Sequence, residues 1–387
     1  MTRILILFAL AIVVLVAMLD LFGPTLFDRA ANRVYDDPPY TLTERGRALF
    51  DDLFVVDLHG DSLLWDRDLT KRLGHGSIDV PRLLEGNVAI QSFFIVTKTP
   101  WITTIDETSP DSDAITTLIV AQEWPTKTWG SLLERALHQA SRLRELAEAS
   151  GGRVVVLKNK ADLETYRAAR ESGEVAVAGL LGVEGAHALE GDLGNLEKLF
   201  EAGVRIVAPT HFFDNDVGGS AHGVDKGGLT ALGRDMVREM EQRGMLLDLA
   251  HASSSVIDDA TSMASRPVIV SHTGVRGTCD NNRNLSDAQL RAIAATGGVV
   301  GIGYWKTAVC GKDAASIARA IVYAASLVGA DHVALGSDFD GAVPVPFDTT
   351  GLGLIVDALL ERGMNEEDVR LVMGENAARV FAETLPD

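Results

Sequence analysis

The sequence predicts an α/β fold, a (β/α)8 TIM-type barrel with insertions, and two observations lead to this prediction. From residue 41 onward, short apolar runs bounded by Gly, Pro or Asp alternate with segments of helical period. Polar residues able to bind a metal follow several of these runs directly, as expected where an active site lies at the C-terminal ends of barrel strands. Because the amino-acid composition does not change along this part of the chain, one barrel is favoured over two open-sheet domains.

The first 23 residues form the most apolar part of the chain. Arg3 precedes residues 4–19, a run of apolar residues without a charge. As a helix, residues 4–23 would span about 30 Å, the thickness of the hydrocarbon layer of a bilayer. The run is followed by no pair of small residues typical of a cleavage site, so a transmembrane signal anchor is favoured over a cleaved signal peptide for residues 1–23. The remainder would then lie on the extracytoplasmic side of the cell membrane, either periplasmic or extracellular.

Residues 24–40, with the sequence Asp36-Asp37-Pro38-Pro39, are predicted to be a linker, and residues 41–387 the barrel domain. A ninth apolar run, residues 154–157, is predicted to be either a strand of the barrel or part of an irregular segment outside it. Residues 97–130 contain Trp101, Trp124 and Trp129 and are the largest predicted insertion, either a lid or a loop anchored by packing. The eight predicted strands are 54–58, 88–96, 175–182, 204–208, 246–249, 268–270, 299–302 and 333–335.

Seven residues suited to metal binding or acid–base chemistry follow six of these strands. His59 and Asp61 are two apart, so both side chains point to the same side of an extended chain. Since the C-terminal ends of barrel strands form one mouth, we expect all seven to meet there as a metal site. They are His59, Asp61, Glu184, His211, His251, His272 and Asp338.

Three further polar residues lie close to these positions. Asp57 is inside its predicted strand, which indicates a structural, hydrogen-bonded role. His187 and His222 do not end strands and are predicted to be loop residues near the mouth, where the alternative is a contact with substrate or with a ligand residue.

The composition excludes one class of partner. The formal net charge is −19, and no cluster of Lys and Arg is present. Because binding to a phosphate backbone requires clustered basic residues, we expect no nucleic-acid partner.

Several separated motifs resemble the membrane dipeptidase (renal dipeptidase) family of zinc peptidases. They occur in one order over roughly residues 49–385. One departure is Tyr304-Trp305, where the family often has an aromatic pair ending in Tyr. The motifs are Leu58-His59-Gly60-Asp61, Gly182-Val183-Glu184-Gly185-Ala186-His187, Leu247-Asp248-Leu249-Ala250-His251-Ala252-Ser253, Val270-Ser271-His272-Thr273, Asn282-Arg283-Asn284-Leu285 and Gly336-Ser337-Asp338-Phe339-Asp340-Gly341.

The resemblance implies two zinc ions per chain and a role for each matching residue. His59 and Asp61 would hold one zinc, His251 and His272 the other, and Glu184 would bridge them. His211 would bind and polarise the scissile carbonyl, Arg283 would bind the carboxylate of the substrate, and Asp338 would transfer protons. The resemblance also implies a homodimer, a state common in the family.

The residues themselves fit hydrolysis of an amide. Two metal ions about 3.5–4 Å apart can share a bridging hydroxide at neutral pH, and the two oxygens of Glu184 can each bind one ion. Asp338 could accept a proton from the water and return it to the leaving amine. The planar guanidinium of Arg283 could bind a carboxylate through two hydrogen bonds, although Asp280 could pair with it instead. Together with the resemblance, which alone singles out Arg283, these features predict a dipeptidase that requires a free C-terminal carboxylate; the alternative is a related two-metal amidohydrolase acting on another amide, a cyclic imide or a lactam.

The two cysteines, Cys279 and Cys310, follow two consecutive predicted strands. In an exported protein they could form a disulfide, whereas in the cytoplasm they would stay free thiols. The family carries a disulfide at matching positions, so the resemblance implies the bonded state.

Overall fold

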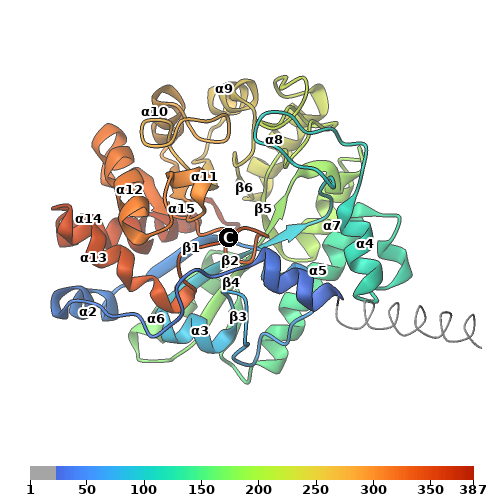
Figure 1. Cartoon of the computed structure of the whole chain (residues 1–387). Coiled ribbons are helices and arrows are strands. Elements are labelled where there is room, and N and C mark those ends of the chain that lie inside the picture. The colour runs from blue at the N-terminus through green and yellow to red at the C-terminus, as the bar shows by residue number, and fades with distance from the viewer. Residues whose placement is uncertain (1–22) are drawn as a thin grey trace, which may run out of the picture.

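The computed structural model describes residues 23–387. Its centre is a sheet of parallel strands surrounded by helices (Figure 1). The strands are β1 (Val55–Gly60), β2 (Val88–Val96), β3 (Val154–Val156), β4 (Val177–Glu184), β5 (Val204–Val207), β6 (Leu246–Leu247), β7 (Ile269–Thr273), β8 (Val299–Ile302) and β9 (Val333–Leu335). The helices are α2 (Glu44–Asp51), α3 (Val80–Glu85), α4 (Ala114–Ala121), α5 (Leu132–Ala149), α6 (Lys160–Glu171), α7 (Asn195–Glu201), α8 (Ala231–Arg243), α9 (Ser254–Met263), α10 (Asp287–Ala295), α11 (Lys306–Val309), α12 (Ala314–Val328), α13 (Gly353–Glu361), α14 (Glu366–Arg370) and α15 (Asn376–Thr384).

The strand order supports the predicted architecture. Neighbouring strands follow the order β6-β5-β4-β2-β1-β9-β8-β7. The two end strands approach each other after β6, where Asp248 and Ile269 form a parallel bridge. A curved parallel sheet whose strands alternate with helices is consistent with a TIM-type fold. Each of the eight strands predicted from apolar runs corresponds to one strand of this path.

The ninth predicted run is β3, which lies off the main path. Its residues Val154 to Val156 pair in parallel with Val177 to Gly179 at the beginning of β4. Val155 is exposed, whereas every residue of β4 is buried. The short strand therefore extends the sheet at the N-terminal end of β4 and contributes nothing to the mouth.

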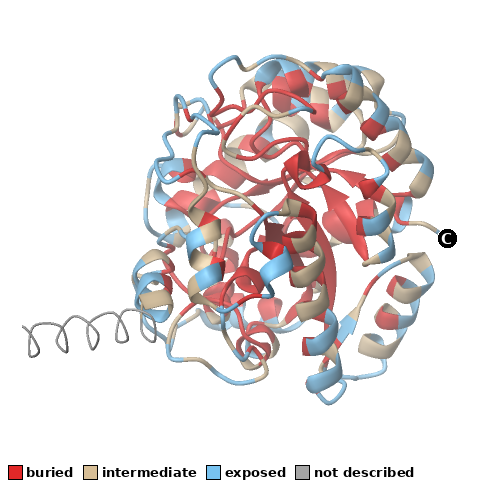
Figure 2. Cartoon of the chain, turned by 90° about the vertical axis from the view of Figure 1, so that its right-hand side faces the viewer, coloured by how far each residue is buried: buried red, intermediate tan, exposed pale blue. Residues whose placement is uncertain are grey.

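The strands carry the core, as Figure 2 shows by the concentration of buried residues on them. All nine residues of β2 and all eight of β4 are buried, which explains why these segments are mainly apolar in the sequence, with Gln91 and Ser92 as polar exceptions within β2. The surrounding helices begin at polar caps. For example, Ser131 accepts a hydrogen bond from the backbone of Glu134 at the start of α5, and Ser286 forms a capping box with Gln289 at α10.

The beginning of the described chain differs from a simple linker. Residues 23–31 are helical, and Asp28 and Asn32 are buried polar residues. Within the predicted linker 24–40, Val34 also forms a parallel bridge with Val345. This segment is therefore packed against the barrel.

The predicted transmembrane segment, residues 1–23, lies almost entirely outside the described residues. Within residues 23–387, no helix combines the length and apolar character needed to cross a membrane. The anchor accordingly stays a prediction from the sequence.

Candidate metal centre

The seven predicted residues all lie at one end of the sheet. His59 and His272 are the last residues but one of β1 and β7, and Glu184 is the last residue of β4. The others follow β1, β5, β6 and β9 within a few residues. All seven are buried, and with the exception of His59 they line one cavity of about 620 Å³. His59 lies directly behind this surface, with Nε2 3.5 Å from Asp61 Oδ1.

Glu184 is the centre of the cluster. Its Oε1 lies 3.0 Å from Nε2 of His251, 3.3 Å from Nε2 of His272 and 3.7 Å from Nε2 of His59. Its Oε2 lies 3.2 Å from Nε2 of His211. One carboxylate thus faces four imidazoles that lie in or follow four different strands, so it can share a bound cation with several of them.

The donor atoms fall into three overlapping groups that are compact enough to hold a cation. Their members, within 4.8 Å of one another, are His59, Glu184 and His272; Glu184, His211 and His251; and His59, Asp61 and Asp338.

The cluster fits bound metal ions better than it fits hydrogen bonding within the protein. Nε2 of His59, Oδ1 of Asp61 and Oε1 of Glu184 are buried without a hydrogen-bond partner among the described residues. Buried polar atoms are rarely unpaired, and imidazole nitrogens and carboxylate oxygens are the usual ligands of zinc. His211 and Asp338 also belong to the compact groups, so distance alone does not separate their roles from those of the ligands.

Burial dominates the electrostatics of the cluster. It raises the pKa of Glu184 well above its usual range, and the neighbouring charge of Asp61 acts in the same direction. Burial also lowers the pKa of His59 to about 4 and that of His251 well below its usual value. The imidazoles are therefore neutral at physiological pH and have a lone pair available for a cation.

Polar residues behind the cluster orient its imidazoles. The hydroxyl of Ser271 lies 3.0 Å from Nδ1 of both His59 and His272. With the proton on Nδ1, each ring donates to Ser271 and directs the lone pair of Nε2 toward Glu184. Asp248 accepts the backbone N–H of Ser271 at 2.8 Å and fixes its position. No pattern in the sequence selects Ser271, since it lies inside a strand beside a more prominent histidine.

Asp57 has the structural role predicted for it. Its carboxylate accepts hydrogen bonds from the backbone N–H of Ser337 at 2.8 Å and from the Ser337 hydroxyl at 2.6 Å. This pairing joins β1 to the loop after β9, which carries Asp338. The carboxyl of Asp338 is itself buried, and burial raises its pKa to about 8, with the charge of His59 opposing the increase.

Arg283 lies at the same cavity. Its Nη2 donates to the carbonyl of His272 at 2.8 Å, and its guanidinium lies over the ring of Trp305 at 5.6 Å. Burial lowers its pKa to about 10, so it stays charged at neutral pH. The alternative pairing with Asp280 is not seen among residues 23–387.

His222 lies at the cavity, although the sequence shows no motif that would assign it to the site. It lines the cavity, its Nδ1 lies 2.9 Å from the carbonyl of Thr104, and its Nε2 has no partner in the described part of the chain. It does not directly follow a strand, so no local pattern identifies it.

Of the three tryptophans in the predicted insertion, Trp101 lines the cavity and is exposed, whereas Trp124 packs in an apolar cluster.

The disulfide implied by the resemblance is present. Cys279 and Cys310 are bonded, with their Cα atoms 5.3 Å apart. The bond joins the loop that carries Arg283 to the segment after β8.

Comparisons with known proteins agree with this geometry. A metallo peptidase from Rhodobacter sphaeroides, solved with a phosphinate mimic of the dipeptide L-Ala-D-Ala, is 26% identical, with a TM-score of 0.70 over 86% of this chain and 99% of the other. A metallo peptidase described as dipeptidase AC is 25% identical, with a TM-score of 0.72 over 87% and 99% of the two chains. An uncharacterised Klebsiella pneumoniae protein from the pqqA 5′ region is 30% identical over 268 residues, 65% of this chain and 97% of the relative.

The family match covers nearly the whole barrel. Residues 43–385 match the family described as Membrane dipeptidase (Peptidase family M19). Together with a cavity that collects histidines and carboxylates at the strand ends, this match shows that the chain is a metal-dependent hydrolase acting on peptide bonds and belongs to the membrane dipeptidase family.

Proposed function

We propose that the protein is a dipeptidase that binds two zinc ions and hydrolyses dipeptides with a free C-terminal carboxylate. The observation that carries this proposal is the position of Glu184, whose Oε1 lies 3.7 Å or less from Nε2 of His59, His251 and His272, imidazoles of both proposed ligand pairs. His59 and Asp61 would hold one ion, and His251 and His272 the other, with Glu184 between them. When bound, two such ions would supply a hydroxide nucleophile at neutral pH and polarise the peptide carbonyl.

The protein's own residues would bind and orient the substrate. Arg283, buried and charged at the cavity wall, would hold the substrate carboxylate through two parallel hydrogen bonds. His211 Nε2, beside Glu184, would donate a hydrogen bond to the carbonyl oxygen as negative charge develops on it. Asp338 would accept a proton at its carboxylate and return it to the nitrogen of the leaving amine.

The test is hydrolysis of a dipeptide panel by the full chain, with metal counted in the same sample. Free-carboxylate dipeptides, including one with a C-terminal D-residue, should be cleaved by protein with about two metals, and chelation should abolish cleavage. Amidated dipeptides should be poor substrates. Two bound metals without cleavage of any dipeptide would instead favour the amidohydrolase alternative.

Arg283→Gln gives a sharper form of the same test. It should lower kcat/KM for a free-carboxylate dipeptide roughly 10- to 100-fold, since a hydrogen-bonded charge is lost. It should change the slow cleavage of the amidated peptide little. Arg291→Gln, on the exposed face of α10, is the matched control. Equal losses on both substrates would contradict a carboxylate-binding role for Arg283.

We also propose that the barrel lies outside the cytoplasm, anchored by residues 1–23. The apolar run supports this location, and so does the disulfide, because such bonds form and persist in oxidising compartments. Protease added to intact cells or spheroplasts should digest the barrel; complete protection would contradict the proposal. The homodimer expected from the resemblance stays a prediction.

A further inference from the structure

Residues 23–31 lie before the family-matched region, which begins at residue 43, yet they contribute to the catalytic cavity. Gly23, Pro24 and Phe27 line the same cavity as Glu184 and Arg283. We infer that this helix, outside the family-matched region, is a wall of the substrate site, and that Phe27 favours dipeptides whose N-terminal residue has a bulky apolar side chain. This inference rests on the proposed dipeptidase function, because it specifies which dipeptides that active site prefers.

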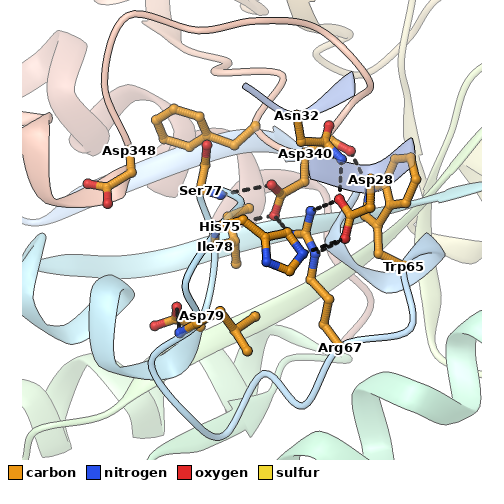
Figure 3. Close-up of polar contacts among 12 residues, drawn as sticks. Asp28, Asn32, Trp65, Arg67, His75, Ser77, Ile78, Asp79, Asp340 and Asp348 are labelled. Atoms are coloured by element: carbon orange, nitrogen blue, oxygen red, sulfur yellow. Dashed lines mark hydrogen bonds and ion pairs between the residues drawn. The ribbon is translucent and has the colours of Figure 1, made fainter. Parts of the chain in front are cut away.

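The helix is held in place by a buried ionic network (Figure 3). Arg67 lies between two carboxylates: its Nε donates to Asp28 at 2.7 Å, and its Nη1 pairs with Asp340 at 2.7 Å. His75 Nε2 lies 2.9 Å from Asp28 Oδ2. Burial acts to raise the pKa of Asp28, but hydrogen bonds from Arg67 and His75 outweigh it and hold the pKa at about 2. Asp28 is therefore charged at physiological pH and docks the helix electrostatically.

The same network connects the helix to the catalytic loop after β9. Asp340, two residues after Asp338, also accepts the backbone N–H groups of Ser77 and Ile78. Asn32 follows the helix, donates to Asp28 at 2.8 Å and accepts the backbone N–H of Ala342 at 2.8 Å. The helix is thus bound through Asp28 and Asn32 to the loop after β9, and it cannot leave the cavity without breaking buried polar pairs.

Phe27, on the helix, and Trp65, after β1, together form an apolar surface at the cavity. Their ring centroids are 6.0 Å apart, and Trp65 is fixed by a 2.7 Å hydrogen bond from Nε1 to the carbonyl of Asp340. Trp65 is 1% exposed, whereas Phe27 is 55% exposed, so Phe27 has free surface that a substrate could cover. Ile115 and Leu118 of α4 line the cavity as well and extend the apolar wall.

The position of Arg283 decides which end of a dipeptide meets this wall. Arg283 follows β7, whereas Trp65 follows β1 and α4 follows β2. Along the strand order, closed by the bridge between Asp248 and Ile269, β2 is four strands from β7 in either direction. The α4 part of the wall therefore lies opposite Arg283, and Trp65, which follows β1 three strands from β7, lies next to it on the far side of the mouth. A dipeptide bound by its carboxylate at Arg283 would direct its N-terminal residue toward Phe27.

The test measures selectivity in the full chain. For the wild type and Phe27→Ala, kcat/KM is measured for two dipeptides that differ only at the N-terminal residue, Phe-Ala and Gly-Ala. The ratio of the two values should fall roughly 5- to 10-fold in Phe27→Ala, as expected for loss of part of an apolar contact. Leu26→Ala is the matched control: Leu26 is 61% exposed on the same helix, does not line the cavity, and its replacement should leave the ratio unchanged.

A second variant and a binding measurement show whether Phe27 acts by direct contact with the substrate. Asp28→Asn weakens the docking of the helix without touching Phe27, and should lower the same ratio. The inhibition constant of a phosphinate dipeptide mimic should rise in Phe27→Ala when the N-terminal side chain of the mimic is benzyl, and stay constant when it is hydrogen. Cleavage of both dipeptides with an unchanged ratio in Phe27→Ala would overturn this inference alone. Failure of the wild type to cleave any dipeptide would overturn the proposed function and this inference with it.

Discussion

Asp338→Asn is expected to lower kcat by about 10²- to 10⁴-fold while the protein keeps its bound metal. The amide of Asn has nearly the same shape as the carboxylate but cannot accept and return a proton at neutral pH. The backbone at Asp338 is left-handed, with φ of 61°, a conformation that Asn also tolerates. The variant should therefore fold normally, and the loss should appear in kcat more than in KM.

Metal content separates the two roles that the geometry allows for Asp338. The residue belongs to a compact group with His59 and Asp61, so it could act as a metal ligand. A ligand role would reduce the metal bound per chain in Asp338→Asn, whereas a proton-transfer role would not. The control is Asp331→Asn, which changes an exposed aspartate outside the cavity and should alter neither quantity. Full turnover in Asp338→Asn would contradict both roles.

The pH profile gives an independent check on Asp338. Burial raises its pKa to about 8 in the protein alone, and nearby bound cations would lower it again because they favour the carboxylate. Proton acceptance requires the ionised form, so activity should rise with pH through this pKa. The acid limb of kcat/KM should accordingly lie below pH 8 in the wild type and be lost in Asp338→Asn.

The barrel strands can be predicted from the sequence because both of their faces are buried. β2 and β4 have no solvent-facing positions, and so they appear as mainly apolar runs, interrupted only by Gln91 and Ser92 in β2 and ended by Glu184 in β4. The same logic locates the site: Glu184 and His272 end such runs, and parallel strands bring their C-terminal ends together. The roles of individual residues follow from the resemblance, since strand position alone does not separate a ligand from a proton carrier.

The parts of the site that the sequence does not predict depend on contacts between distant segments. Phe27 falls in a predicted linker because its neighbourhood shows no regular pattern, and it is brought to the cavity by the pairing of Asp28 with Arg67 and His75. His222 reaches the mouth from the far part of the long loop between β5 and α8, well beyond the end of the strand. The hydroxyl of Ser271, in β7, contacts the imidazoles of both His59 in β1 and His272 in β7. Such arrangements follow from tertiary packing, which local periodicity does not encode.

Glu184→Gln is expected to have the largest effect on the metal centre. The amide offers one oxygen and no negative charge to a position that faces four imidazoles. Metal bound per chain should fall from about two to below one, and kcat/KM should fall roughly 10³-fold or more, because water activation and carbonyl polarisation both depend on the ions. Metal analysis of dialysed protein and dipeptide hydrolysis measure the two quantities. Glu174→Gln, an exposed substitution before β4, is the control for a general effect of removing a carboxylate.

Stability distinguishes loss of a ligand from damage to the fold. Burial raises the pKa of Glu184 well above its usual range, which favours the neutral carboxylic acid in the metal-free protein, and Gln is closely similar to that form in shape and charge. The metal-free variant should therefore melt within a few degrees of the metal-free wild type. Metal at about 1,000 times its Kd stabilises a folded site by about 4 kcal/mol, enough to raise the Tm of the wild type by roughly 4–10 °C. That increase should be absent or much smaller in Glu184→Gln. An equal metal-induced increase in both proteins would mean that Glu184 is not a ligand, and that the unpaired oxygen at the centre of the cluster serves another purpose.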